Sequence, residues 1–262
     1  MRLTDITTKT ALVKSGIPGV AYVINPYLGC GHGCRYCYAA FMSKFARHHR
    51  GAPWGSFVEA KINIPQVLRG ELRRKKQVAR ALLSSVCDPY QPAERRYRLT
   101  RQCLELLIEF GWGIDILTRS PLVTRDLDLL AAAPGATVGL SIPTDDDRVR
   151  KLLEPQAPPI GARVAALKAL HAAGLEPWVF IAPMLPMQPA RLYDLIVPFV
   201  GHVMMDPLNY RSQVRQFFRQ HHWDYALTDD FAGQTRAELL RLFGPKAGRG
   251  RSGKGSAAPP EG

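Results

Sequence analysis

Short apolar runs alternate with longer amphipathic segments along most of this chain. The apolar runs predict strands, and the longer segments, whose apolar positions repeat at helical spacing, predict helices between them. We expect strands at residues 21–24, 79–87, 114–117, 137–142, 178–182 and 202–205, with an extended segment at 57–63. We expect helices at residues 38–47, 65–74, 94–110, 125–133, 161–173, 190–199, 213–221 and 235–243.

Strands that are joined through helices need crossover connections and therefore lie parallel in one sheet. The pattern thus predicts an α/β fold, built as an open or closed barrel with ligands at the carboxyl ends of its strands. We divide the chain into a lead-in (1–19), a barrel core (20–210), C-terminal helices (211–245) and a flexible basic tail (246–262) rich in Gly, Ser, Ala and Pro.

Nothing in the sequence favours a membrane or an export route. The first 15 residues carry charges and no apolar core, unlike an export signal, and the most apolar run, residues 195–205, is too short to span a bilayer. We therefore expect a cytoplasmic protein with no membrane partner.

The net charge of +13 comes partly from two basic stretches, residues 69–80 and 95–101, and partly from the tail. A polyanion such as nucleic acid is a possible partner, and solvated helix faces are the alternative. If nucleic acid binds, we expect the two stretches to lie beside the barrel mouth.

Three cysteines follow the first predicted strand with the spacing C-x3-C-x2-C, at Cys30, Cys34 and Cys37. Three thiolates this close can each bind one iron of a [4Fe–4S] cluster and leave the fourth iron open to a ligand. A zinc knot that includes His32 is the alternative, but the second pair of ligands typical of zinc sites is missing. Cys103 lies on the apolar stripe of its helix, so we expect it in the core.

Residues 24–39 read Ile-Asn-Pro-Tyr-Leu-Gly-Cys-Gly-His-Gly-Cys-Arg-Tyr-Cys-Tyr-Ala. This segment resembles the radical S-adenosylmethionine (SAM) superfamily, in the branch related to spore photoproduct lyase and labelled DNA repair photolyase-like, and the likeness extends over about residues 14–210. The resemblance implies a partial (β/α)6 TIM-type barrel with SAM on the open iron of the cluster. An electron from a reductant such as flavodoxin or ferredoxin would cleave SAM to a 5′-deoxyadenosyl radical.

The resemblance also implies contacts to SAM from four residues. Tyr36 would lie near the adenine, and Asp88 would meet the amino group in place of the Gly-Gly-Glu motif that is absent here. Arg119 would pair with the SAM carboxylate, and Ser141 would contact SAM from a strand end. The plain alternatives are packing beside the cluster for Tyr36, an Asx-turn for Asp88, a surface ion pair for Arg119 and an ordinary strand-end hydroxyl for Ser141.

Cys87 ends the strand predicted at 79–87 and is either a hydrogen-atom donor, as the resemblance implies, or a small polar filler. The main interpretation is a radical SAM enzyme whose substrate is unknown, with a lyase acting on a DNA lesion or a modified nucleotide as the candidate that the resemblance suggests. The alternative is an iron–sulfur or zinc-knot nucleic-acid-binding protein without SAM chemistry, which has no use for Asp88, Arg119 and Ser141 at successive strand ends.

Overall fold

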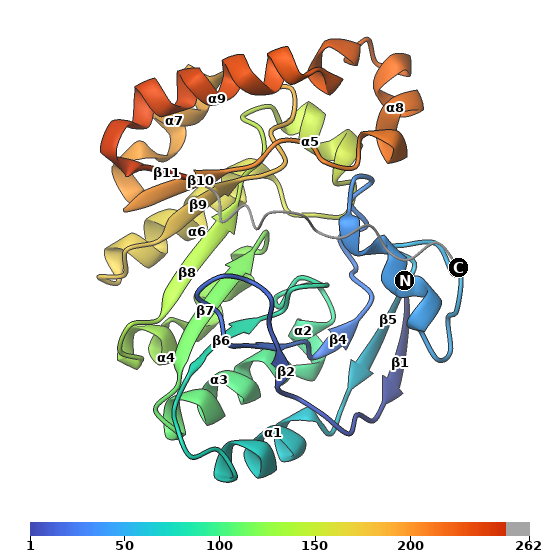
Figure 1. Cartoon of the computed structure of the whole chain (residues 1–262), viewed down its shortest axis with the longest axis vertical. Coiled ribbons are helices and arrows are strands. Elements are labelled where there is room, and N and C mark those ends of the chain that lie inside the picture. The colour runs from blue at the N-terminus through green and yellow to red at the C-terminus, as the bar shows by residue number, and fades with distance from the viewer. Residues whose placement is uncertain (250–262) are drawn as a thin grey trace.

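The computed structural model of this chain describes residues 1–249. An eight-stranded sheet with the order β11-β10-β9-β8-β7-β6-β3-β2 forms the centre of the molecule (Figure 1). Its strands from β3 to β11 run parallel, and β2 pairs antiparallel with β3. The strands are β2 (Val13–Lys14), β3 (Tyr22–Ile24), β6 (Arg80–Leu83), β7 (Gly113–Thr118), β8 (Thr137–Ser141), β9 (Trp178–Ile181), β10 (His202–Met205) and β11 (Ala247–Arg249).

The six predicted parallel strands are confirmed as β3 and β6 to β10, and with them the α/β partial-barrel fold class. The strand predicted at 79–87 is too long, because Ser84 takes a left-handed conformation (φ 66°) and the chain turns directly after Leu83. Cys87 and Asp88 therefore lie in a loop beyond the carboxyl end of β6.

A second, three-stranded sheet was not predicted. It has the order β1-β5-β4 and consists of β1 (Arg2–Ile6), β4 (Tyr27–Leu28) and β5 (Phe57–Lys61). The extended segment at 57–63 therefore belongs to this small sheet and not to the barrel. The lead-in, residues 1–19, provides one strand to each sheet, β1 and β2.

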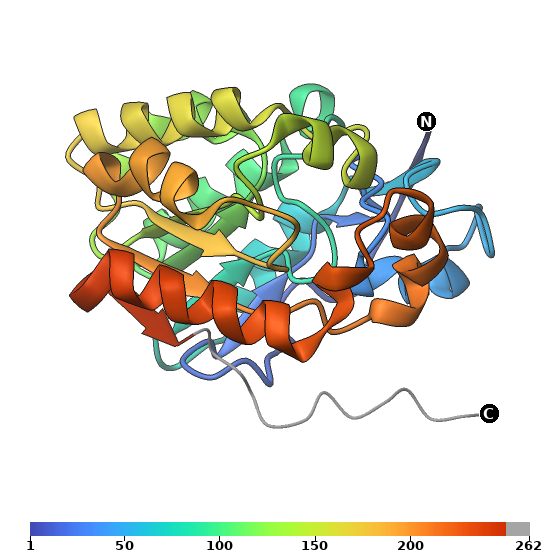
Figure 2. The ribbon, with the colours of Figure 1, turned by 90° about the horizontal axis from the view of Figure 1, so that it is seen from above.

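The helices that connect the parallel strands cover one face of the sheet, as the view from above shows (Figure 2). They are α1 (Ile64–Arg73), α2 (Glu94–Tyr97), α3 (Leu99–Glu109), α4 (Leu127–Ala132), α6 (Ile160–Ala172) and α7 (Pro189–Ile196). Helix α5 (Asp147–Leu153) packs instead against Cys34, Tyr36 and Phe218. The helix predicted at 94–110 is broken into α2 and α3 at Arg98, whose φ is 52°. The segment Tyr38–Phe45 is a 3-10 helix (η1) instead of an α-helix, and α5 was not predicted.

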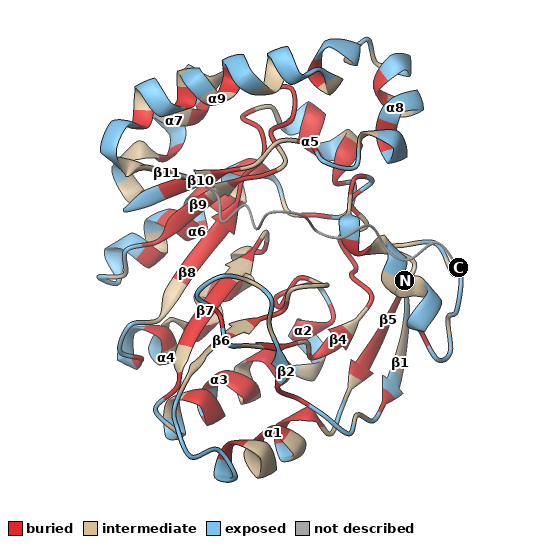
Figure 3. Ribbon diagram, viewed as in Figure 1, coloured by how far each residue is buried: buried red, intermediate tan, exposed pale blue. Residues whose placement is uncertain are grey.

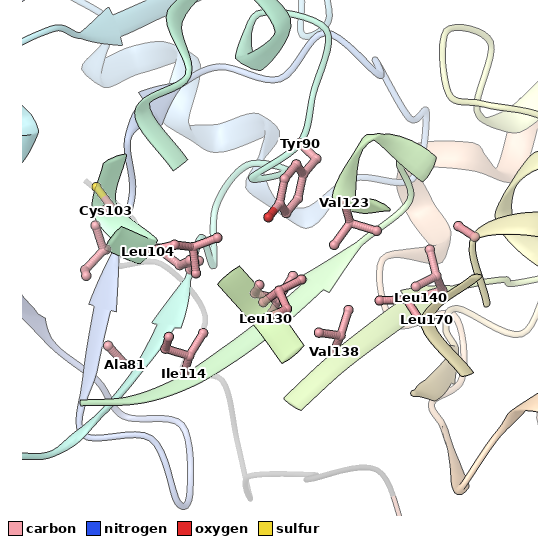
Figure 4. Close-up of a cluster of buried hydrophobic side chains, with 14 of the residues drawn as sticks. Ala81, Tyr90, Cys103, Leu104, Ile114, Val123, Leu130, Val138, Leu140 and Leu170 are labelled. Carbon is pink, nitrogen blue, oxygen red and sulfur yellow. The ribbon is translucent and has the colours of Figure 1, made fainter. Parts of the chain in front are cut away.

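The main core lies between this helical layer and the sheet. Figure 3 shows that buried residues line both sides of the interface between them, and Figure 4 shows members of the cluster in detail. Cys103 has no exposed surface and packs in this core, as predicted. Gly139 of β8 leaves room for Trp178 of β9, because a Cβ at Gly139 would come within 2.3 Å of the indole ring.

The chain after β10 returns to the sheet. Helices α8 (Arg211–Gln220) and α9 (Asp229–Phe243) follow the last predicted strand, and β11 then pairs with β10. The tail was predicted to join no core from residue 246 on, and this is wrong for Ala247–Arg249; residues 250–262 lie outside the described part. Among residues 1–249, no helix has the length and apolar character that crossing a membrane requires.

The first basic stretch does not lie where we expected it. Residues 74–76 connect the end of α1 to β6, so they lie at the amino ends of the strands, opposite the predicted site. Arg69 is paired with Glu109 at 2.6 Å and Arg80 with Asp115 at 2.7 Å. In the second stretch, Arg101 binds three carboxylates, so part of the positive charge seen in the sequence is neutralised.

Candidate functional site

The three clustered cysteines lie on one loop, residues 29–37, which we call the cysteine loop. It begins directly after β4 and ends where η1 begins, close to the carboxyl end of β3. Cys30 and Cys34 are buried and Cys37 is half-buried, and all three are free thiols. The loop is thus placed at the carboxyl ends of the parallel strands, where a barrel of this type binds its ligands.

Glycines let the cysteine loop pack directly against its neighbours. Gly29 has a φ of 90°, and a Cβ on it would lie 2.5 Å from the carbonyl oxygen of Phe57. Gly33 has a φ of 59° and lies against Gly55, where a Cβ on Gly55 would come within 2.7 Å of the Gly33 Cα. Side chains at these positions would force the loop away from β5 and the segment before it.

Gln91 fixes the cysteine loop through both ends of its amide. Its Oε1 accepts a hydrogen bond from the backbone N–H of Gly31 at 2.8 Å, and its Nε2 donates to the carbonyl of Gly29 at 3.1 Å. The Gln91 side chain is fully buried, so both bonds form away from water. The amide therefore sets the backbone on either side of Cys30.

The Asp88 carboxylate joins the cysteine loop to the end of β7. It accepts hydrogen bonds from the Thr118 hydroxyl at 2.6 Å and from the backbone N–H of Arg119 at 2.7 Å, and His32 Nε2 lies 3.3 Å from its Oδ2. The N–H of Tyr90 also binds it, which is the Asx-turn of the plain alternative. Burial raises the pKa of Asp88, but His32, Thr118 and the Arg119 N–H outweigh burial and hold it at about 2. The contact of Asp88 with SAM stays a prediction.

Arg119 lies in a buried network that we call the site network, made of Tyr36, Arg119, Glu154 and Arg163. Glu154 has no exposed surface and accepts hydrogen bonds from Arg119 Nε at 2.9 Å, from Arg163 and from the Tyr36 hydroxyl. Burial raises the pKa of Glu154, but Arg163 and Arg119 outweigh burial and hold it at about 2. Arg119 keeps 22% of its side chain exposed and is the only arginine of this network that solvent or a ligand reaches.

The remaining two predicted residues lie close to this network and to the cysteines. Ser141 ends β8, where its carbonyl accepts a hydrogen bond from Arg163 at 2.9 Å and its hydroxyl lies 3.5 Å from the carbonyl of Ala182. The Cys87 sulfur lies 3.4 Å from the carbonyl of Tyr27, and burial raises the pKa of this thiol to about 11. The structure thus gathers Tyr36, Asp88, Arg119 and Ser141 around one site.

The donors of the cysteine loop fit an iron–sulfur cluster. Burial raises the pKa of all three thiols, and Arg119 and Arg163 oppose this at Cys34, so positive charge already lies where thiolates would form. Among residues 1–249, no three His, Cys, Asp or Glu side chains are grouped so as to hold a metal ion. A cubane cluster instead takes each thiolate on a different iron.

Two residues of the site, Gln91 and Glu154, were not predicted from the sequence. Gln91 lies three residues after Asp88, in the loop that follows β6. A second polar side chain so close to a predicted site residue could have indicated it. Glu154 lies at the end of α5, and nothing in its local sequence indicates that it meets Tyr36, which is 118 residues away.

A sequence model of the radical SAM superfamily matches residues 24–195. An uncharacterized protein of Methanocaldococcus jannaschii is 37% identical over 186 residues, which cover 71% of this chain and 69% of that protein. An uncharacterized protein of Mycobacterium tuberculosis is 36% identical over 194 residues, or 70% of this chain, and the match spans only 56% of its length.

Solved structures of spore photoproduct lyase share the fold. A complex of that enzyme with dinucleoside spore photoproduct matches with a TM-score of 0.65 at 16% identity, covering 94% of this chain and 81% of that one. A variant with bound AdoMet and the same dinucleoside matches with a TM-score of 0.63 at 15% identity and the same coverage. At this level of identity the likeness concerns the arrangement of the elements, including the partial barrel.

Proposed function

Since this chain belongs to the radical SAM superfamily, we propose that it holds a [4Fe–4S] cluster on Cys30, Cys34 and Cys37 and cleaves SAM reductively. When bound, the cluster supplies the electron that converts SAM into methionine and a 5′-deoxyadenosyl radical, which takes a hydrogen atom from the substrate. The observation that carries this proposal is the cysteine loop itself: three free thiols at the carboxyl ends of the strands, inside the matched region.

The residues around the loop would bind and orient SAM. Arg119, with its partly exposed guanidinium, would bind the SAM carboxylate, and Glu154 and Tyr36 would hold that guanidinium in place. Tyr36 would also border the adenine, and Ser141 would contact SAM from the end of β8. The Asp88 carboxylate already accepts hydrogen bonds from Tyr90, Thr118 and Arg119. It would therefore bind the SAM amino group through the lone pairs that these donors do not use.

The test is anaerobic reconstitution with iron and sulfide, followed by incubation with SAM and dithionite. We expect four irons per chain, a broad charge-transfer absorption in the blue and release of 5′-deoxyadenosine. A colourless protein that holds zinc would overturn the cluster, and an intact cluster without 5′-deoxyadenosine would favour the iron–sulfur binding protein. Replacing dithionite by reduced flavodoxin or ferredoxin tests the proposed physiological donors in the same assay.

A second part of the proposal concerns the substrate, for which a specific surface favours nucleic acid. We call it the aromatic platform: Tyr38, Phe41 and Phe45 of η1, which are 46%, 45% and 59% exposed, together with Tyr210. The rings of Tyr38 and Tyr210 are 6.5 Å apart and nearly parallel, and those of Phe41 and Phe45 are 6.4 Å apart. Because η1 begins directly after Cys37, this platform borders the cysteine loop.

Cations accompany these rings. Lys44, Arg47 and Arg50 are exposed and form no ion pair among the described residues, and no acidic residue occurs between positions 38 and 56. Exposed rings on which bases stack, next to cations that meet phosphates, are typical of surfaces that bind single-stranded nucleic acid. The platform and not the stretch at 69–80 is therefore our candidate for a nucleic-acid surface, and a lyase acting on a modified nucleotide is the finer function that it supports.

Binding of a fluorescent single-stranded oligonucleotide at several salt concentrations tests this part. Log affinity should fall linearly with log salt, by roughly 0.7 per phosphate contact, and Phe41→Ala with Phe45→Ala should cost about 1–3 kcal/mol for each lost stack. Tyr225→Ala, at an exposed aromatic elsewhere, and charge reversal at Arg73 and Arg74 are the controls. If the platform variants bind as the unaltered chain does, or nothing binds at low salt, the substrate is a small molecule or a peptide.

A further inference from the structure

The face of the large sheet opposite the main core carries a row of side chains that begins at Ser141. Successive side chains of a strand point to opposite faces, and Ile181 of β9 and Met205 of β10 belong to the main core. Phe180 and Met204, one residue earlier on each strand, therefore point to the other face. Across β8, β9 and β10, Ser141 pairs with Phe180 and Phe180 pairs with Met204 (Figure 1).

Phe180 and Met204 are large apolar side chains that the rest of the described chain does not bury. Both are half-buried. Within residues 1–249, neither packs against the main core or against the hydrophobic cluster that contains Cys34 and Tyr36. They therefore offer an apolar surface beside Ser141 that a ligand can cover.

Asp206 follows directly on this row at the carboxyl end of β10. Its N–H donates to the carbonyl of Ile181 at 3.3 Å, and its carbonyl accepts from the N–H of Met184 at 2.9 Å. The backbone thus continues the pairing with the chain after β9, which places the Asp206 side chain on the same face as Met204. The carboxylate is half-buried and forms no hydrogen bond or ion pair with any residue of the range 1–249. Burial raises the pKa of Asp206, and Arg236 opposes this only in part.

The segment after Asp206 connects this surface to the cysteine loop. Leu208 is buried in the same hydrophobic cluster as Cys34 and Tyr36. Tyr210, two residues further on, belongs to the aromatic platform and lies 6.5 Å from the Tyr38 ring. Asp206 therefore lies where the end of the sheet meets the cysteine loop, on the way to the platform.

We call Phe180, Met204 and Asp206 the floor, and we propose that it binds the ring of the substrate, with Asp206 selecting a nucleobase that carries an exocyclic amino group. This inference rests on the proposed function, which supplies a nucleotide as the substrate. An ionised carboxylate only accepts hydrogen bonds, and acidic side chains accept from the amino group of cytosine. Thymine presents carbonyl oxygens on both sides of its one ring N–H, and a carboxylate repels these oxygens. An aromatic ring such as that of Phe180 supplies a stacking surface for the base.

The test is calorimetric titration of the reconstituted, SAM-bound and unreduced protein with deoxycytidine and thymidine dinucleotides. The unaltered chain should prefer the deoxycytidine dinucleotide by on the order of 10-fold. Asp206→Asn, which replaces one acceptor by a donor, should weaken binding of that dinucleotide by about 10-fold or more and remove the preference. Phe180→Ala should weaken binding of both dinucleotides by roughly 5- to 150-fold, as expected for the loss of one stack.

Two matched variants control for the loss of a carboxylate and of a ring elsewhere. Asp194→Asn removes an exposed carboxylate from α7, and Phe199→Ala removes a half-buried ring before the amino end of β10. Both should bind the dinucleotides as the unaltered chain does. Iron content and thermal unfolding show whether each variant is folded and loaded.

The possible failures of the floor and of the proposed function differ in this experiment. Equal affinity of the unaltered chain for the two dinucleotides, or unchanged affinities in a loaded Asp206→Asn protein, would overturn the role of Asp206. Weaker SAM binding by Asp206→Asn without dinucleotide would assign Asp206 to the SAM site and overturn it as well. Normal release of 5′-deoxyadenosine without binding of either dinucleotide would contradict the nucleotide substrate and the floor but not SAM cleavage. A chain that assembles no cluster contradicts the proposed function itself.

Discussion

Two buried charge networks lie near each other in this protein, and their difference separates structure from function. One is the site network around Glu154. The other, which we call the closed network, joins Glu94 and Asp126 to Arg101 and Arg125, with the Tyr27 and Tyr90 hydroxyls at its edges. Glu94, Asp126 and Glu154 all have no exposed surface.

The two networks differ in charge balance and not in exposure, since the Arg101, Arg119 and Arg125 side chains are each 17–22% exposed. In the closed network two buried carboxylates face two arginines, and each carboxylate oxygen accepts at least two hydrogen bonds. In the site network one buried carboxylate faces two arginines, and one of these arginines is partly exposed beside Cys34. A network whose charges balance and whose carboxylate oxygens are all hydrogen-bonded stabilises the fold. A network with surplus positive charge on a partly exposed arginine favours the binding of an anionic ligand.

The largest effect is expected at the thiols next to the site network. Replacing Cys30, Cys34 or Cys37 by Ala should abolish cluster assembly, because two thiolates cannot hold three irons of a cubane. Iron and sulfide analysis after anaerobic reconstitution measures this. A variant that still binds four irons would show that its cysteine is not a ligand.

Glu94→Ala breaks the closed network and should lower the free energy of unfolding by about 3–5 kcal/mol, since Arg125 and the buried Tyr27 hydroxyl lose their partner. Urea unfolding measures the loss. At low temperature, where the variant is still folded, its SAM affinity should match that of the unaltered chain. A changed SAM affinity with unchanged stability would reverse the roles that we give the two networks.

Arg119→Ala should weaken SAM binding by about 1.5–3 kcal/mol, because a charge-assisted contact to the carboxylate is lost. Glu154 keeps Arg163 and the Tyr36 hydroxyl as partners, so iron content should not change. Anaerobic titration with SAM measures the affinity, and Arg119→Lys, which keeps the charge but not the fork of donors, should lie in between. Equal affinity in all three proteins would exclude Arg119 from the SAM site.

The smallest effect is expected at Cys103, which belongs to neither network. Cys103→Ala removes one fully buried sulfur from the core and should cost about 1 kcal/mol of stability. Iron content, SAM affinity and the cluster potential should all stay the same. Loss of cluster in this variant would mean that the fifth cysteine takes part in assembly.

The sequence by itself determined the parts that depend on neighbours along the chain. The alternation of apolar runs and amphipathic segments predicted the six parallel strands, because each strand and helix must bury its own apolar face. The spacing of Cys30, Cys34 and Cys37 predicted one loop with three thiols, because residues so close in the chain cannot separate in space. Cys103 was placed correctly for the same reason, by the periodicity of its own helix.

Only the tertiary structure decided which distant groups meet. Arg98 takes a left-handed conformation that splits the predicted helix, and Glu94 at the start of α2 then caps α3 by accepting from the backbone of Thr100. The pairing of Tyr36 with Glu154 depends on how α5 packs against the cysteine loop. The sequence also cannot show that the basic residues at 74–76 lie at the opposite end of the strands from the cysteines. Local periodicity specifies elements, but the meeting of side chains is settled by the packing of all elements together.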